Sequence, residues 1–201
     1  MLLDEAKSTG NTLTADMVLD GGVVATAAFN SKWPLAEGGY YDFEAATRDG
    51  EAAFVQVKAL GSGESLNSVP KKWFTDALFS VDGRYGAYGA PSDLKLKEVE
   101  GAGDARSFDV SFTVLSPGGA DVPRKGVMKA IQAPGSQDVL MLTASSGANK
   151  WKSSETEARS IATSFRIART QPTALKREAS ADYRFGKTSG PSTMKSRNDG
   201  F

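Results

Sequence analysis

An alternation of apolar and polar residues over positions 107–114 constrains the fold of this chain most strongly. Phe108, Val110 and Phe112 alternate with serine, threonine and aspartate, which is the period of a strand with one buried face. Further strand-like runs lie at residues 23–29, 40–46, 53–60, 94–99, 126–132 and 139–144. Glycine- and proline-containing turns separate most of these runs, so we expect antiparallel hairpins.

Two segments have helical spacing instead. Apolar residues recur at i, i+3, i+4 and i+7 from Phe74, and Ser68 is the expected N-cap of this helix. The same spacing begins again at Ala158, where Ser154 and Glu157 form a capping-box pattern. Strands outnumber helices, so the sequence predicts an α+β fold with an antiparallel β-sheet flanked by helices.

The chain divides into three parts by composition. Residues 1–16 are polar and are expected to form an extended or partly helical N-terminal extension, and residues 17–169 suit one domain. Residues 170–201 are basic and poor in apolar side chains, which predicts an extended C-terminal tail.

No run of the sequence approaches the about 20 apolar residues of a membrane span. No signal peptide is visible, so we expect that any targeting peptide is absent from this chain.

Two missing residue types narrow the possible chemistry. The sequence has no cysteine and no histidine, which excludes disulfides, His-metal sites and nucleophilic sites built on histidine. Lys plus Arg and Asp plus Glu number 24 each, and a net charge of zero argues against a general nucleic-acid binder. We therefore expect a non-catalytic protein that works by binding, with no directly bound cofactor or metal.

Several short motifs, in their order along residues 21–168, resemble those of the PsbP family. They are Ser31-Lys32-Trp33-Pro34, Tyr41-Asp42-Phe43-Glu44, Phe54-Val55-Gln56-Val57, Lys150-Trp151-Lys152 and Ala162-Thr163-Ser164-Phe165. The resemblance implies an α-β-α sandwich and a role as an extrinsic or auxiliary subunit on the lumenal side of photosystem II or photosystem I. The implied location is the chloroplast thylakoid lumen, peripheral to the membrane.

The resemblance also implies partners and leaves alternatives open. The partners would be membrane-embedded photosystem subunits and other extrinsic lumenal proteins. Calcium is implied by resemblance only, because the best-known family member helps retain calcium and chloride at the water-oxidising cluster. The N-terminal segment does not match that of this family member. A transient assembly or repair factor for a photosystem or the NDH complex, and a small-ligand or lipid carrier, are the alternatives.

Basic and aromatic side chains are the candidate partner-binding residues, since cations meet acidic partners while aromatic rings bury at a contact centre. They are Lys71, Lys72, Arg124, Lys125, Lys150, Trp151, Lys152, Lys176, Arg177, Tyr183, Arg184, Phe185 and Lys187. Each has a structural alternative. Trp151 packs on its own domain while Lys150 and Lys152 are solvated, and Lys71 and Lys72 lie on a solvent-facing first turn of a helix. Arg124 and Lys125 lie in a plain exposed loop after Pro123, and the tail has no role.

Asp42 and Glu44 share one face of the expected strand over residues 40–46. Paired carboxylates suit calcium binding or acid–base chemistry, but no loop has EF-hand spacing. We expect a solvated strand face here, since the polar half of an antiparallel sheet commonly faces water.

Overall fold

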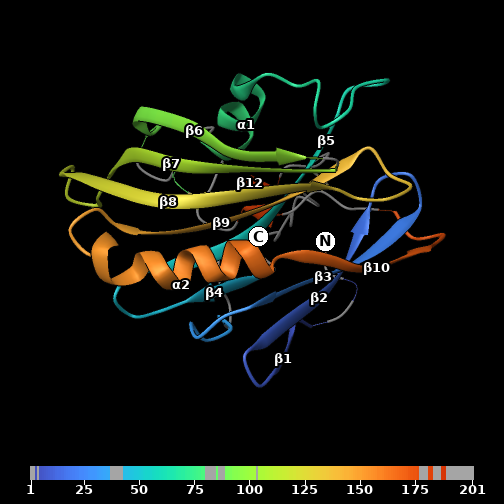
Figure 1. Cartoon of the computed structure of the whole chain (residues 1–201), viewed down its shortest axis with the longest axis horizontal. Helices are drawn as coiled ribbons and strands as arrows, with labels where there is room; N and C mark the ends of the chain where they lie inside the picture. The colour runs from blue at the N-terminus through green and yellow to red at the C-terminus, as the bar shows by residue number, and fades with distance from the viewer. Residues whose placement is uncertain are drawn as a thin grey trace, which may run out of the picture.

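The computed structural model describes residues 3, 5–36, 43–79, 85, 89–102, 104–176, 181–182 and 187–188. This part of the chain contains mainly antiparallel β-sheet with two α-helices, which confirms the predicted α+β fold (Figure 1).

The larger sheet has six antiparallel strands. Their order is β4 (Glu44–Ala46), β5 (Ala52–Ala59), β9 (Asp138–Gly147), β8 (Asp121–Gln132), β7 (Ala105–Leu115) and β6 (Ser92–Ala102). Four of these strands follow one another as a meander from β6 to β9, because each is joined to the next by a short turn. Strand β5 then pairs with β9, which places the β4–β5 hairpin at the other edge of the sheet.

A smaller sheet packs on the other side of the long helix. Its strand order is β1 (Lys7–Thr9), β2 (Thr12–Leu19), β3 (Val23–Asn30) and β10 (Arg166–Pro172). A separate two-stranded sheet pairs β11 (Ala181–Asp182) with β12 (Lys187–Thr188). Helix α2 (Trp151–Ser164) contacts β8 and β9 of one sheet and β3 of the other, and it runs between the two sheets in Figure 1. Helix α1 (Lys71–Leu78) lies across the larger sheet from α2, next to β6.

Two apolar clusters cover the two faces of the larger sheet. The inner core surrounds α2 and includes Val55, Leu142 and Ile161. The outer core lies on the α1 side and includes Phe54 and Phe108. Strand β9 is buried over almost its whole length, which explains why residues 139–144 are a continuous apolar run rather than an alternating one.

The expected domain boundaries both fall inside strands. Strand β2 crosses the expected boundary between residues 16 and 17, and its Leu13 and Ala15 are buried in the inner core. The reading of residues 1–16 as a separate extension is therefore corrected for β1 and β2. Strand β10 crosses the boundary at residue 170, because its last residues pair with β3 through Pro172 and Val23.

Both predicted helix caps are wrong. Helix α1 begins after Pro70, and the Ser68 hydroxyl instead donates to the Ser65 carbonyl at 2.8 Å. Helix α2 begins at Trp151, three residues before the expected cap. The turn that leads into the helix is closed by the Lys150 N–H, which donates to the Gly147 carbonyl. Ser154 therefore lies within the helix.

Glu44 corrects the expected solvated strand face. Its side chain is only 2% exposed, and the neighbouring Phe43 and Ala45 are buried in the inner core as well. Strand β4 is thus covered on both faces. Asp42, the other half of the expected carboxylate pair, lies outside the described residues.

Arg106 of β7 is the most heavily engaged cation of the described residues. Its Nε and Nη2 groups donate to the two carboxylate oxygens of Glu98 at 2.7 and 3.0 Å. Its Nη1 donates to the carbonyls of Leu66 and Val69 at 3.2 and 2.8 Å, while its guanidinium lies 4.9 Å from the Phe74 ring centroid. One side chain thereby ties the loop before α1 to strands β6 and β7.

This contact makes stability depend on pH. The hydrogen bonds from Arg106, followed by its positive charge, hold the pKa of Glu98 below its ordinary value of 4.5. A carboxyl with a lowered folded-state pKa stabilises the fold above its unfolded pKa, and this contribution disappears as the pH falls through the folded pKa. We expect Glu98→Gln to lower the free energy of unfolding at pH 7, with a smaller difference from wild type below pH 4.5. Urea titrations at pH 7 and pH 3 measure this, and an equal difference at both would contradict it.

Candidate functional site

A groove with four cations in its lining lies between α2 and strands β6, β7 and β8 of the larger sheet. We call it the basic groove and define it by Lys95, Lys97, Asp109, Lys125, Trp151 and Arg159, which line a cavity of about 270 Å³. Its residues come from four elements, β6, β7, β8 and α2.

Strand register brings the sheet residues of the groove together. Lys95 pairs with Ser111, which in turn pairs with Lys125, so these three side chains form one row across β6, β7 and β8. Lys97 pairs with Asp109 in a second row two positions along the strands. Both rows share the α2 face, because the intervening residues of β7 point into the outer core.

Helix α2 supplies the opposite wall. Trp151 and Arg159 are two helical turns apart and therefore lie along one side of the helix. The Nη1 group of Arg159 donates to Asp109 Oδ1 at 2.8 Å, and its Nε donates to Glu155 Oε1 at 2.9 Å. The hydrogen bond to Asp109, followed by that to Glu155, raises the pKa of Arg159. These two carboxylates hold the guanidinium over the sheet.

The groove concentrates positive charge that the chain as a whole lacks. Lys152 is seven residues before Arg159 and lies on the same side of α2. Four cations, Lys95, Lys97, Lys125 and Arg159, line the groove, and Lys152 lies beside it on α2. The carboxylates near them are Asp109 and Glu155. The four lysines are exposed and have no hydrogen bond or ion pair within the described part of the chain.

Trp151 belongs both to the groove and to the core. It is half-buried and packs against the inner core, in agreement with the alternative that Trp151 packs on its own domain. Its remaining exposed surface lines the groove next to Lys125. The ring is therefore anchored in its own domain while it still offers apolar surface to a partner.

Arg124 and Lys125 lie in strand β8, so the expected loop after Pro123 is wrong. Strand β8 begins at Asp121 and pairs with β7 from there to Ile131. The two neighbours point to opposite faces of the sheet. Lys125 therefore enters the basic groove, and Arg124 does not.

Arg124 and Lys150 hold the turn between β4 and β5. Arg124 Nη2 donates to the carbonyl of Gly50 and to Ser145 Oγ, each at 3.0 Å. Lys150 Nζ donates to the carbonyl of Asp49 at 3.2 Å and lies 3.3 Å from its carboxylate. These contacts give both side chains a structural role, and their expected partner binding stays a prediction.

The remaining candidates lie apart from the groove. Lys71 and Lys72 are exposed on α1, across the sheet, and Lys72 pairs with Asp76 at 2.6 Å. Lys176 is exposed near the end of the continuously described chain. Outside the described residues lie Arg177, Tyr183, Arg184 and Phe185, as does the side chain of Lys187 in β12.

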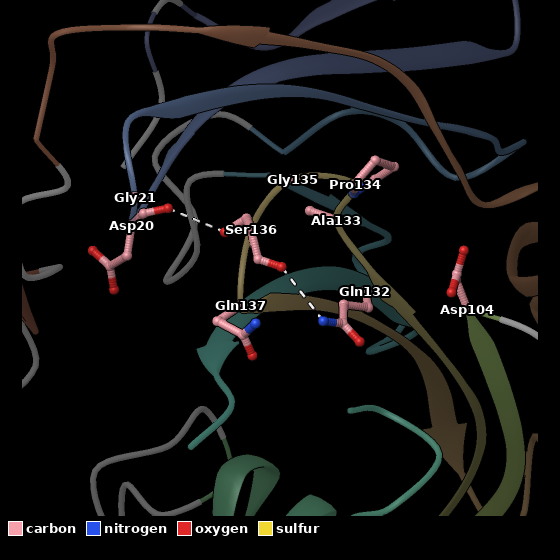
Figure 2. A pocket seen from close by; sticks show the side chains of 9 residues that line it. All are labelled: Asp20, Gly21, Asp104, Gln132, Ala133, Pro134, Gly135, Ser136 and Gln137. Carbon is pink, nitrogen blue, oxygen red and sulfur yellow. Dashed lines mark hydrogen bonds between the residues drawn. The ribbon is translucent and has the colours of Figure 1, made fainter. Parts of the chain in front are cut away.

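A second cavity, of about 650 Å³, lies between the β2–β3 and β8–β9 turns (Figure 2). Its polar groups largely bind one another: Ser136 Oγ donates to the Asp20 carbonyl at 3.1 Å, and Gln132 Nε2 donates to the Ser136 carbonyl at 3.4 Å. Asp20 and Asp104 lie on opposite sides of the view in Figure 2. The Ser136–Asp20 contact joins the two turns, and the Gln132–Ser136 contact closes the β8–β9 turn.

Calcium is implied by the family resemblance only, and no direct binding is expected. In the described part of the chain, no three carboxylates gather closely enough to hold a metal ion.

Neither of the two described helices is long and apolar enough to cross a membrane.

Comparisons with known proteins find similarity only among solved structures. The sequence matches no protein-family model and no curated protein sequence. One similar structure is the solution structure of cyanobacterial PsbP (CyanoP) from Synechocystis sp. PCC 6803, with a TM-score of 0.44 and 14% identity over 81% of this chain and 91% of that one. Another is the crystal structure of LpqN, involved in cell envelope biogenesis of Mycobacterium tuberculosis, with a TM-score of 0.33 and 11% identity over 83% and 86% of the two chains. Likenesses this distant indicate no function.

Proposed function

We propose that this chain is a non-catalytic auxiliary subunit that docks through the basic groove on an acidic surface of a photosynthetic membrane complex. One observation carries the docking surface: four cations line one cavity together with a half-exposed tryptophan, in a chain with no net charge. Such a patch attracts an acidic partner and orients it during the encounter. The sequence motifs that resemble the PsbP family support a photosystem as the partner.

The arrangement of the groove suits docking on a protein. An aromatic ring with a fixed position offers contact area at a low cost in conformational entropy, and Trp151 is held by the inner core. Exposed lysines around such a ring provide the charge-complementary rim found at interfaces. Trp151 would form the centre of the contact, and the four lysines would select an acidic partner.

Charge reversal tests the proposal. We expect Lys95→Glu, Lys97→Glu and Lys125→Glu together to weaken binding by about tenfold or more, because each introduced glutamate would repel an acidic partner. The binding partners are photosystem membranes stripped of their extrinsic subunits. Co-sedimentation at increasing salt measures the binding, and the wild-type chain should detach as salt screens the charges.

The matched control reverses three exposed cations outside the groove. Arg48→Glu, Lys58→Glu and Arg169→Glu give the same net charge and should bind as wild type does. Equal loss in both triple variants would reject the groove as the docking surface. Binding only to assembly intermediates, and not to mature complexes, would favour the alternative of an assembly factor.

A further inference from the structure

We infer that the basic groove recognises an extended acidic segment of its partner, with carboxylates on alternate residues. This inference refines the proposed function, since it specifies the chemistry that the same groove selects. It depends on the spacing of the cations, which the strand register determines.

The cations of the groove are spread both along and across the strands. Lys95 and Lys97 are two residues apart on a regular stretch of β6, which separates their Cα atoms by about 7 Å. Lys125 lies two strands away from Lys95 in the same row, at about twice the strand spacing, or about 10 Å. An extended partner would meet these cations at separate points, whereas one phosphate would have to draw them together at a single point.

An extended polypeptide has the matching period. Its residues i and i+2 point to the same side and are also separated by about 7 Å. Two carboxylates at such positions would therefore meet Lys95 and Lys97 together. A concave groove also favours a partner with projecting side chains over a flat lipid surface.

Arg159 strengthens the preference for carboxylates. Asp109 and Glu155 hold its guanidinium in place, but their contacts engage three of its five N–H donors. Donors therefore remain for an incoming carboxylate, and a guanidinium already in position loses less freedom on binding.

Synthetic peptides test this inference on the isolated full chain. One peptide carries two glutamates separated by a serine, and a second has the same composition with the two glutamates adjacent. Adjacent residues of an extended chain point to opposite sides, so we expect the alternate peptide to bind about tenfold more tightly. Isothermal titration calorimetry at low salt measures both affinities.

A single lysine provides the matched comparison. Lys97→Gln should abolish the difference between the two peptides, whereas Lys58→Gln on β5 should preserve it. Equal affinity of the wild-type chain for both peptides would overturn the inference. Tighter binding to phosphatidylglycerol vesicles or to inorganic phosphate than to the alternate peptide would also overturn it.

The two proposals fail separately. A chain that binds the alternate peptide but not photosystem membranes would reject the photosystem as the partner and support the recognition inferred here. A chain that binds the membranes equally well with and without the Lys97→Gln change, and shows no peptide preference, would reject the inferred recognition alone.

Discussion

Replacing Arg106 with methionine is expected to lower the free energy of unfolding by about 3 kcal/mol, because removal of one partner leaves buried polar groups without hydrogen bonds. The side chain of Arg106 is 10% exposed and that of Glu98 is 31% exposed, so solvent screens the Glu98 end of the contact only in part. The carbonyls of Leu66 and Val69 would lose their charged donor at the same time. Urea-induced unfolding followed by circular dichroism measures the change.

A matched change elsewhere separates this effect from the loss of an arginine in general. Arg169→Met replaces an exposed arginine of β10, for which we expect a change within about 0.5 kcal/mol. A similar loss in both variants would contradict a special role of Arg106. The double variant Arg106→Met with Glu98→Gln should recover part of the lost stability, since it no longer leaves an unpaired carboxylate.

Gly126→Ala is expected to destabilise the larger sheet by about 2 to 3 kcal/mol, because overpacking forces neighbouring atoms out of their positions. A Cβ atom at Gly126 would lie 2.6 Å from the Ala144 carbonyl oxygen and 2.8 Å from Ser145 Cβ. Both neighbours belong to the adjacent strand β9, which is buried on both faces and cannot easily move. Thermal unfolding of the purified variant measures the loss.

Gly118→Ala is the control for this variant. Gly118 lies in the turn between β7 and β8, and the nearest atom to an added Cβ would be Ser116 Oγ at 4.0 Å. We expect this variant to unfold at nearly the wild-type temperature. If Gly126→Ala were equally harmless, strands β8 and β9 would have to be less tightly packed than the described structure indicates.

Part of the basic groove was visible in the sequence. Lys125 and Trp151 were candidates by composition, but Lys95, Lys97 and Arg159 were not. The alternation of Lys95, Leu96 and Lys97 was a usable signal for a strand with a basic face. It could not show which face that was, because a shift of one residue in register would turn every side chain to the other side.

Patterns of apolar residues were enough to predict the strands over residues 23–29, 107–114 and 139–144, the apolar side of α2 and the α+β class. These depend on local periodicity, which the sequence carries directly. Only the tertiary structure decided that residues 12–19 form a core strand and that Arg124 supports a turn while its neighbour Lys125 enters the groove. Such outcomes depend on register and on contacts between residues far apart in the chain, and no local pattern records either of them.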